Sequence, residues 1–307
     1  MRAITCEKYG PPNVLKLVDL PKPKPNNNEV LIKIMATTVN SGDVRVRGLK
    51  VDGFLLRFFM RLVIGFNKPR NTVLGITFSG IIEKVGKKVS TYKTGDTVFG
   101  ITGFKFGTYA EYIVLNKNDV FIKKPMNATF AEAAALSFGG STALYFLNKT
   151  AITKMPGLNI LIYGATGSVG TAAIEISKYY KAQVTSVCSN EGEKLARKLG
   201  SNYVIVYTEA DFTLPSNTYD IVFDAVGKIS KKDCKKILRE NGTYISVKGL
   251  DYAKKTKAQL TFLKTLFESN QLHANIDKTF SLEEIIEAHE YVDSGRKKGN
   301  VVIDINS

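Results

Sequence analysis

One stretch of twelve residues, 159–170, constrains the fold of this chain more than any other. Ile160 to Tyr163 form a short apolar run that is typical of a buried strand, and a glycine-rich turn follows it. From Ser168 to Tyr180, apolar residues recur at helical spacing. A strand, a glycine turn and a helix in this order bring unpaired backbone N–H groups and the positive end of a helix dipole to the turn. The stretch therefore predicts a nucleotide-binding unit that holds the pyrophosphate of a dinucleotide.

The turn departs from the usual G-x-G-x-x-G pattern at its first position. It reads Ala165-Thr166-Gly167-Ser168-Val169-Gly170, with Gly164 directly before it, and we call residues 164–170 the glycine turn. Gly167 would let the backbone approach the phosphates, and Gly170 would let the helix pack closely on the strand. An ordinary turn without a ligand is the alternative. Four further apolar segments, expected as strands, favour cofactor binding because they alternate with helical patterns, as in a parallel sheet; they are 183–188, 203–207, 219–224 and 242–247.

The end of the second expected strand favours NADPH over NADH. An NAD site normally places Asp or Glu there, against the ribose 2′-hydroxyl, whereas this chain has Ser189 and Asn190. Both side chains can hydrogen-bond a 2′-phosphate without repelling it. Three later side chains could reach the same phosphate: Lys194, Arg197 and Tyr207. Glu191 and Glu193 would repel it, so NADH stays the less favoured alternative.

Composition limits the other classes of protein. The net charge is +15, but the lysines are scattered and no nucleic-acid-binding motif is visible, so no specific nucleic-acid partner is expected. Three distant cysteines and two histidines argue against a disulfide framework and against a metal site. No apolar run is long enough to span a bilayer, and the first residues resemble a strand rather than a signal peptide. These features predict a cytoplasmic protein.

The pattern of the first third of the chain differs from the pattern around the glycine turn. Short strands separated by turn residues predict an antiparallel, barrel-like catalytic domain over residues 1–118. A cofactor-binding domain with a doubly wound parallel sheet is expected over residues 119–250. Residues 251–307 are expected to return to the first domain, with a last strand at 301–305. The active site is expected in the cleft between the domains.

Six short pieces of sequence, in this order, resemble the medium-chain dehydrogenase/reductase superfamily, and within it the zinc-free branch of quinone oxidoreductases. The pieces are Tyr9-Gly-Pro-Pro12, Val39-Asn-Ser-Gly-Asp43, Gly75-Ile-Thr-Phe-Ser-Gly80 with Val85-Gly86, Gly95-Asp-Thr-Val-Phe-Gly100 with Tyr109-Ala-Glu-Tyr112, Ala133-Ala-Ala-Leu136 with Gly140-Ser-Thr-Ala143, and the glycine turn. The resemblance implies a GroES-like barrel domain joined to a Rossmann domain.

The resemblance also implies a reaction without zinc. Zinc alcohol dehydrogenases place a cysteine where this chain has Val39-Asn40, and His-Glu where it has Ile76-Thr77. They also carry a lobe with four cysteines, which is missing here. A catalytic zinc needs about three protein ligands, and this chain cannot supply them.

The same resemblance assigns candidate site residues. Asn40 and Thr142 would contact the nicotinamide end of the cofactor. Other residues would line the cofactor: Val226, Gly227, Val247, Lys248, Gly249 and Asn300. Each assignment has a structural alternative, because Asn40 could cap a short helix and Thr142 could bond a carbonyl of its own helix. No side chain stands out as the proton donor; a cofactor ribose hydroxyl, a tyrosine or solvent could serve.

These observations favour hydride transfer from NADPH to a small lipophilic quinone or α,β-unsaturated carbonyl. One alternative is a reductase of enoyl thioesters or 2-alkenals. Another is a cofactor-binding protein without enzymatic activity that contacts RNA or a membrane surface.

Two segments leave questions open. Residues 54–66 are apolar around most of a short helix, interrupted by Arg57 and Arg61. They indicate either a buried loop helix over the cleft, a lid for a lipophilic substrate, or a weak contact with a membrane surface. The region after Gly249 is shorter than the family norm, which leaves the geometry of a homodimer open.

Overall fold

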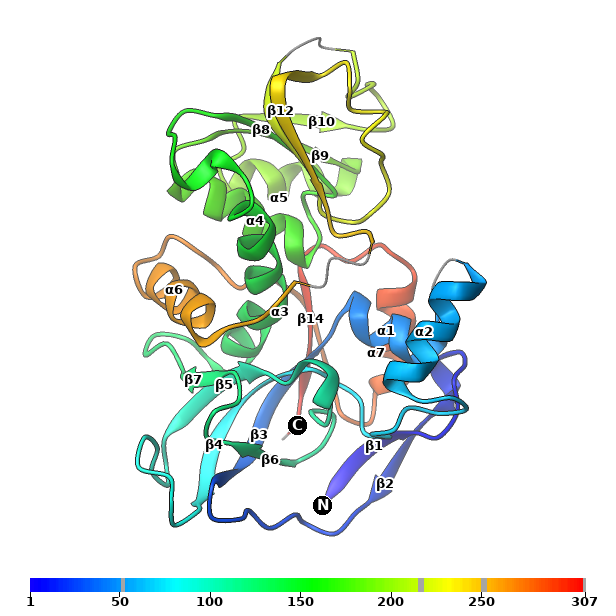
Figure 1. Cartoon of the computed structure of the whole chain (residues 1–307), viewed down its shortest axis with the longest axis vertical. Coiled ribbons are helices and arrows are strands. Elements are labelled where there is room, and N and C mark those ends of the chain that lie inside the picture. Colours follow the sequence, from blue (N-terminus) through cyan, green and yellow to red (C-terminus); the bar gives the residue numbers. More distant parts are fainter. Residues whose placement is uncertain (51–52, 215–217, 250–252, 306–307) are drawn as a thin grey trace. The chain divides into compact units, whose positions relative to one another are not determined.

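The computed structural model describes residues 1–50, 53–214, 218–249 and 253–305 (Figure 1). The chain forms two compact units, one made of Met1–Ser137 with Ile276–Ser307 and the other of Phe138–Asn275. Both divisions lie further along the chain than the expected boundaries at 118/119 and 250/251. The long helix α3 (Phe130–Leu147) crosses the first division, and α6 (Lys257–Glu268) belongs to the second unit because its Leu263 packs on Gly140 of α3.

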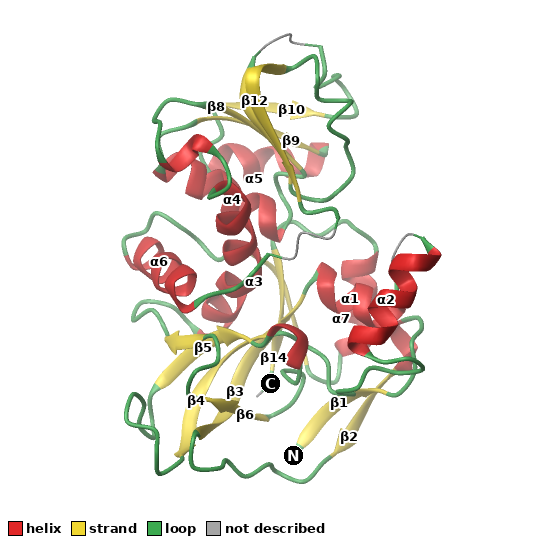
Figure 2. Ribbon diagram, in the orientation of Figure 1, coloured by secondary structure: helices red, strands yellow, loops and turns green. Residues whose placement is uncertain are grey.

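The first unit is built on a seven-stranded, mostly antiparallel sheet (Figure 2). Its order is β13-β14-β3-β4-β5-β7, and β6 pairs with β3. The strands are β3 (Glu29–Val39), β4 (Thr77–Val85), β5 (Thr97–Ile101), β6 (Tyr112–Asn116), β7 (Phe121–Lys123), β13 (Ile276–Ser281) and β14 (Asn300–Asp304). Along one edge, β3 pairs with β6 through 29–33 and with β14 through 36–39. This change of partner curves the sheet towards a barrel.

Smaller elements complete the first unit. β1 (Arg2–Cys6) and β2 (Leu15–Asp19) form a separate antiparallel pair. The helices are α1 (Ser41–Gly48), α2 (Phe54–Ile64) and α7 (Ile285–Asp293). α1 begins directly where β3 ends, because Asn40 and Asp43 form a capping box there.

The second unit has a five-stranded parallel sheet in the order β10-β9-β8-β11-β12. The strands are β8 (Asn159–Tyr163), β9 (Gln183–Cys188), β10 (Tyr203–Val206), β11 (Tyr219–Asp224) and β12 (Leu238–Ser246). Taken in chain order this is 3-2-1-4-5, the arrangement of a Rossmann sheet. Ile160, Leu161 and Ile162 are fully buried, as expected for a central parallel strand. The predicted fold class is therefore confirmed.

Helices α4 (Ser168–Tyr179) and α5 (Glu193–Lys198) connect the first three strands of that sheet. The connection from β11 to β12 differs, because residues 231–237 form a series of turns and contain no α-helix. The strand order still places the carboxyl ends of β8, β9 and β11 next to one another. A ligand of a parallel sheet binds at this edge.

Candidate cofactor-binding site

The glycine turn lies where β8 meets α4 and is held by backbone contacts. The N–H groups of Gly164 and Ala165 both donate to the carbonyl of Val187, at 3.0 and 3.2 Å. Gly167 is the N-cap residue of α4, so no side chain caps the first turn of this helix. Uncapped N–H groups at a helix start attract an anion, which is what a pyrophosphate requires.

The space around the three glycines of the turn distinguishes Gly164 and Gly170 from Gly167. A Cβ on Gly170 would overlap the carbonyl oxygen of Gly164, and a Cβ on Gly164 would overlap the side chain of Val226. Gly164 also has a φ of +73°, which favours glycine. Gly167 is different, because the nearest atom to its Cβ position is 3.7 Å away. The turn is thus tight at its ends and open at Gly167, where the phosphates were expected to approach.

The residues expected to select NADPH gather at the end of β9. Tyr207 is brought there by its N–H, which donates to the carbonyl of Cys188 at 3.1 Å. Ser189 and Asn190 follow β9 directly, and Gly192 lies against Thr166 of the glycine turn. Lys194 is exposed on α5. Arg197 is a weaker candidate than expected, because its guanidinium pairs with Glu193 at 2.7 Å.

A buried carboxylate that the sequence analysis missed organises the next loop. Asp224, at the end of β11, is 0% exposed and accepts hydrogen bonds from four successive backbone N–H groups; these belong to Val226, Gly227, Lys228 and Ile229. It also accepts one from the Ser246 hydroxyl at 3.0 Å. Asp224 therefore fixes the loop expected to line the cofactor. Its position at the carboxyl end of a strand was the available signal.

The loop after β12 lies beside the loop that Asp224 holds. The Val247 N–H donates to the carbonyl of Asp224 at 3.1 Å. A Cβ on Gly227 would contact the side chain of Lys248 at 3.1 Å, and Gly249 adopts a φ of +113°. The structure thus brings together the two segments that the resemblance assigned to the cofactor, 226–227 and 247–249.

Thr142 lies near the glycine turn and has an unexpected partner. A Cβ on Gly139 would overlap the carbonyl oxygen of Ser168, so α3 packs directly on the start of α4. Thr142 is one helical turn further along α3, and its Oγ1 accepts a hydrogen bond from Nζ of Lys255 at 2.6 Å. Burial lowers the pKa of Lys255 to about 7. No sequence signal separated Lys255 from the many other lysines.

In the first unit, Asn40 caps α1, as its structural alternative proposed. Its Oδ1 accepts hydrogen bonds from the N–H groups of Gly42 and Asp43, at 2.8 and 3.3 Å. Its Nδ2 is buried and has no hydrogen-bond partner among the residues that the structure describes. An unsatisfied buried donor is costly, so this amide is suited to bind a carbonyl or hydroxyl oxygen. The Asn40 side chain can therefore cap α1 with its Oδ1 and bind a ligand with its Nδ2.

A buried polar cluster supports the Asn40 corner. Burial raises the pKa of the Asp43 carboxyl to about 7, although hydrogen bonds from the backbone N–H of Asn40 and from Tyr109 oppose that shift. His289 packs edge-on against the Tyr109 ring, and burial followed by the charge of Arg47 lowers its pKa to about 3. We use the name buried polar cluster for five residues: Asn40, Asp43, Arg47, Tyr109 and His289. His289 is distant in sequence from the other four.

Two further findings concern metals and membranes. Among the residues that the structure describes, no group of three or more His, Cys, Asp or Glu side chains could hold a metal ion. Thr77 lies in the segment where zinc alcohol dehydrogenases carry His-Glu. It is buried, and its hydroxyl forms a hydrogen bond with the Thr38 hydroxyl at 2.7 Å. Over the described ranges, no helix combines the length and hydropathy needed to cross a membrane. Asn300, the remaining candidate, is buried on β14.

Known proteins resemble this chain over its whole length. Two family models match, the alcohol dehydrogenase GroES-like domain over residues 26–126 and zinc-binding dehydrogenase over residues 249–303. A 2-methylene-furan-3-one reductase of Solanum lycopersicum is 32% identical, with 99% of this chain and 79% of the relative covered. A chloroplastic NADPH-dependent alkenal/one oxidoreductase of Arabidopsis thaliana is 29% identical over the same shares. The structure of a quinone oxidoreductase from Coxiella burnetii has a TM-score of 0.88 and 30% identity, with 100% of this chain and 99% of that one covered.

Proposed function

Because the chain belongs to the medium-chain dehydrogenase/reductase superfamily, we propose that it uses NADPH, without a metal ion, to reduce the conjugated double bond of an enone or to reduce a quinone to its hydroquinone. It is an oxidoreductase that draws its electrons from a reduced nicotinamide dinucleotide. A quinone is a cyclic conjugated dione, so one hydride-accepting chemistry covers both substrate classes. The relatives named for reduction of an alkenal, an enone and a quinone support this choice.

The open backbone at Gly167 carries the proposal. The glycine turn would hold the pyrophosphate, and the loops at 226–227 and 247–249 would flank the nicotinamide half. When bound, the cofactor supplies a hydride to the electrophilic carbon of the substrate. The protein contributes orientation, and the free Nδ2 of Asn40 offers a hydrogen bond to a ligand oxygen.

Lys255 is the side chain we assign to proton delivery. Adding a hydride to an enone leaves a negative charge that needs one proton, and Nζ of Lys255 already donates to Thr142 at 2.6 Å. Because burial lowers its pKa to about 7, the ammonium can give up a proton near neutral pH and regain it from water. Lys255 takes the place of the ribose, tyrosine and solvent alternatives.

The charge pattern at the end of β9 supports NADPH. Ser189 and Asn190 provide hydrogen-bonding groups, and Lys194 is exposed nearby, whereas NAD sites carry an acid at this strand end. The Asn190 amide donates to Glu209 at 3.1 Å, so a 2′-phosphate would have to displace that carboxylate. We expect Asn190→Asp to raise the KM for NADPH about tenfold, with little change for NADH. Steady-state kinetics with both coenzymes checks this. Asn202→Asp is the matched control, because Asn202 lies just before β10 and its Oδ1 accepts from the Val184 N–H at the start of β9. Equal effects of the two variants would contradict the proposal.

A turnover panel tests the reaction itself. Purified protein, treated with a chelator and assayed for residual metal, is offered 2-alkenals, cyclic enones, enoyl thioesters and quinones with NADPH. We expect oxidation of NADPH on enones or quinones at a rate unchanged by the chelator. Turnover of simple alcohols, or activity that is lost with a bound metal and restored by zinc, would overturn the proposal.

Two variants test Lys255. Lys255→Met should lower kcat while NADPH affinity stays constant, and should remove the fall in kcat that the wild type shows as pH rises above about 7. Lys255→Arg keeps the charge but cannot release a proton at neutral pH. If Lys255→Arg restored kcat and its pH profile, Lys255 would act through its charge alone.

A further inference from the structure

Helix α2 exposes an apolar face to solvent. Phe58, Phe59, Leu62 and Val63 lie on one side of the helix because their spacing is i, i+1, i+4 and i+5. Their exposed fractions lie between 41% and 55%, and that of Phe66, just beyond the helix, is 52%. Ile64, on the opposite side, is 3% exposed. For the described side chains, the expectation of a buried loop helix is therefore wrong; the side chains of residues 54–56 lie outside the description.

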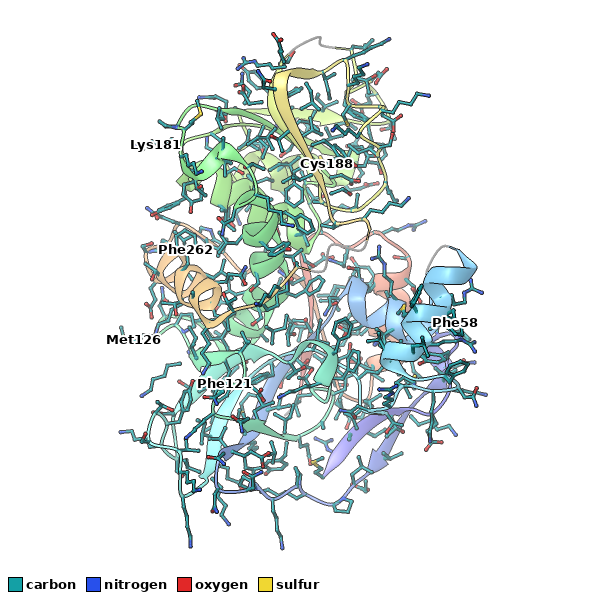
Figure 3. All side chains as sticks on the ribbon, in the orientation of Figure 1. Phe58, Phe121, Met126, Lys181, Cys188 and Phe262 are labelled. Carbon is teal, nitrogen blue, oxygen red and sulfur yellow. The ribbon has the colours of Figure 1, made fainter. Side chains whose placement is uncertain are left out.

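These five residues form one continuous surface, which we call the aromatic patch. The Phe58 ring lies 6.2 Å from the Phe59 ring and 6.1 Å from the Phe66 ring, in edge-to-face contacts. Figure 1 shows α2 at the periphery of the first unit, and Figure 3 marks Phe58 on it. Contiguous exposed apolar surface of this kind usually marks an interaction site.

The segment of sequence that carries the aromatic patch, between Asp52 and Glu83, has charges of one sign. From Gly53 to Ile82 the sequence contains four Arg or Lys residues and no Asp or Glu. The cations are Arg57, Arg61, Lys68 and Arg70. Arg57 directly precedes Phe58 in the chain and Lys68 follows Phe66 by two residues, and both side chains are exposed. Arg70 donates to the Leu62 carbonyl at 2.8 Å, which ties the segment after α2 back to the helix.

This charge pattern selects among the occupants of the patch. A second copy of this chain, bound through the same face, would bring the four cations of each copy together in a protein of net charge +15. An anionic bilayer surface meets both features, since phenylalanine and leucine side chains enter the boundary between headgroups and acyl chains while Arg and Lys contact lipid phosphates. Their long side chains can reach outwards from the apolar face to do so.

We propose that the aromatic patch binds this protein to the surface of an anionic lipid bilayer, with Phe58, Phe59 and Phe66 in the interface and Arg57 and Lys68 on phosphate groups. The inference rests on residues 57–70 and is independent of the proposed reaction. It also provides a route by which a lipophilic substrate dissolved in the bilayer would meet the enzyme.

The absence of tryptophan from the sequence allows a direct test with the full chain. Phe59→Trp introduces a single fluorophore into the patch, and Tyr203→Trp introduces one at an exposed site in the other unit. On titration with phosphatidylcholine vesicles containing about one-third phosphatidylserine, the emission at position 59 should shift to shorter wavelength, because the ring leaves water. The emission at position 203 should stay unchanged.

Vesicle co-sedimentation then separates the apolar and the charged contributions. The double variant Phe59→Ser with Val63→Ser should weaken vesicle binding about tenfold. The double variant Arg57→Gln with Lys68→Gln should weaken it by a similar factor and should also reduce the salt dependence of binding. Lys181→Gln/Lys198→Gln, two exposed lysines of the other unit, is the control and should bind like the wild type. NADPH oxidation on a soluble substrate should be unchanged in all three variants, which also shows that they fold.

Several results would overturn the inference. Equal binding to neutral and anionic vesicles would show that lipid charge plays no part in binding. An unchanged emission wavelength at position 59 would show that the aromatic patch does not enter the bilayer. Sedimentation equilibrium that shows a dimer abolished by Phe59→Ser/Val63→Ser would identify a second copy as the occupant. A raised KM for a soluble substrate in that variant, without any loss of lipid binding, would identify α2 as a substrate lid instead.

Discussion

The two candidate sites of this molecule, the glycine turn and the Asn40 corner, differ in whether backbone or side-chain groups form them. The glycine turn of the second unit consists of backbone: its contacts are N–H groups, carbonyls and the space left by missing side chains. The Asn40 corner of the first unit depends on the side chains of the buried polar cluster. The first site should therefore fail when a Cβ is added and tolerate other changes, whereas the second should respond to charge and pH.

The strongest test of this contrast is Gly170→Val. Its Cβ would overlap a backbone carbonyl that cannot move aside, so we expect NADPH binding to weaken at least about a hundredfold. Gly167→Ala is the matched control for folding, since the position is open and its φ is −80°. It should keep the thermal midpoint of the wild type and weaken NADPH about tenfold. Isothermal titration measures the affinity for NADPH, and thermal unfolding measures the midpoint. An unchanged affinity in Gly170→Val would show that the glycine turn is not part of the cofactor site.

The buried polar cluster should show itself in the pH dependence of stability. The folded pKa of Asp43, about 7, lies above its ordinary value of 3.8, so folding takes up a proton between about pH 4 and 7 and stability falls there as pH rises. The folded pKa of His289, about 3, lies below its ordinary value of 6.5, so stability rises with pH between about 3 and 6.5. The two slopes oppose each other in the wild type.

Replacing either Asp43 or His289 should reveal the contribution of the other residue to the pH dependence of stability. Asp43→Asn keeps an oxygen for the Asn40 N–H, and its free energy of unfolding should rise from pH 4 to 6.5 by roughly 2–4 kcal/mol more than that of the wild type. His289→Gln should show the opposite change. Urea unfolding at a series of pH values measures these slopes, and parallel curves for all three proteins would show that neither group is buried as described.

Asp224 tests whether the second unit is purely a backbone site. Asp224→Asn keeps one oxygen for the three N–H groups that share Oδ1, but it places an NH₂ group where Oδ2 now accepts from the Ile229 N–H and the Ser246 hydroxyl. We therefore expect a loss of about 2 kcal/mol in unfolding free energy and roughly tenfold weaker NADPH binding. Asp220→Asn, on the same strand but at its other end, should affect stability alone. If both variants bound NADPH equally well, the loop at 226–227 would not depend on its carboxylate.

The residues that could be predicted share one property, which is local patterning. Gly164, Gly167 and Gly170 lie within seven residues, and their meaning follows from the strand before them and the helix after them. The same holds for Ser189 and Asn190 at a strand end. The boundaries of the compact units could not be read this way, because α3 runs through one division and α6 joins its unit by packing against α3.

By itself, the amino-acid sequence determined the order of strands and helices, the position of the glycine turn and the family, because hydrophobic period and glycine spacing act over a few neighbouring residues. Only the tertiary structure decided that Lys255 meets Thr142 across 113 positions, that Asp224 gathers four N–H groups, and that the apolar side of α2 faces water. Burial and long-range contact set those properties, and both arise only when distant segments pack together.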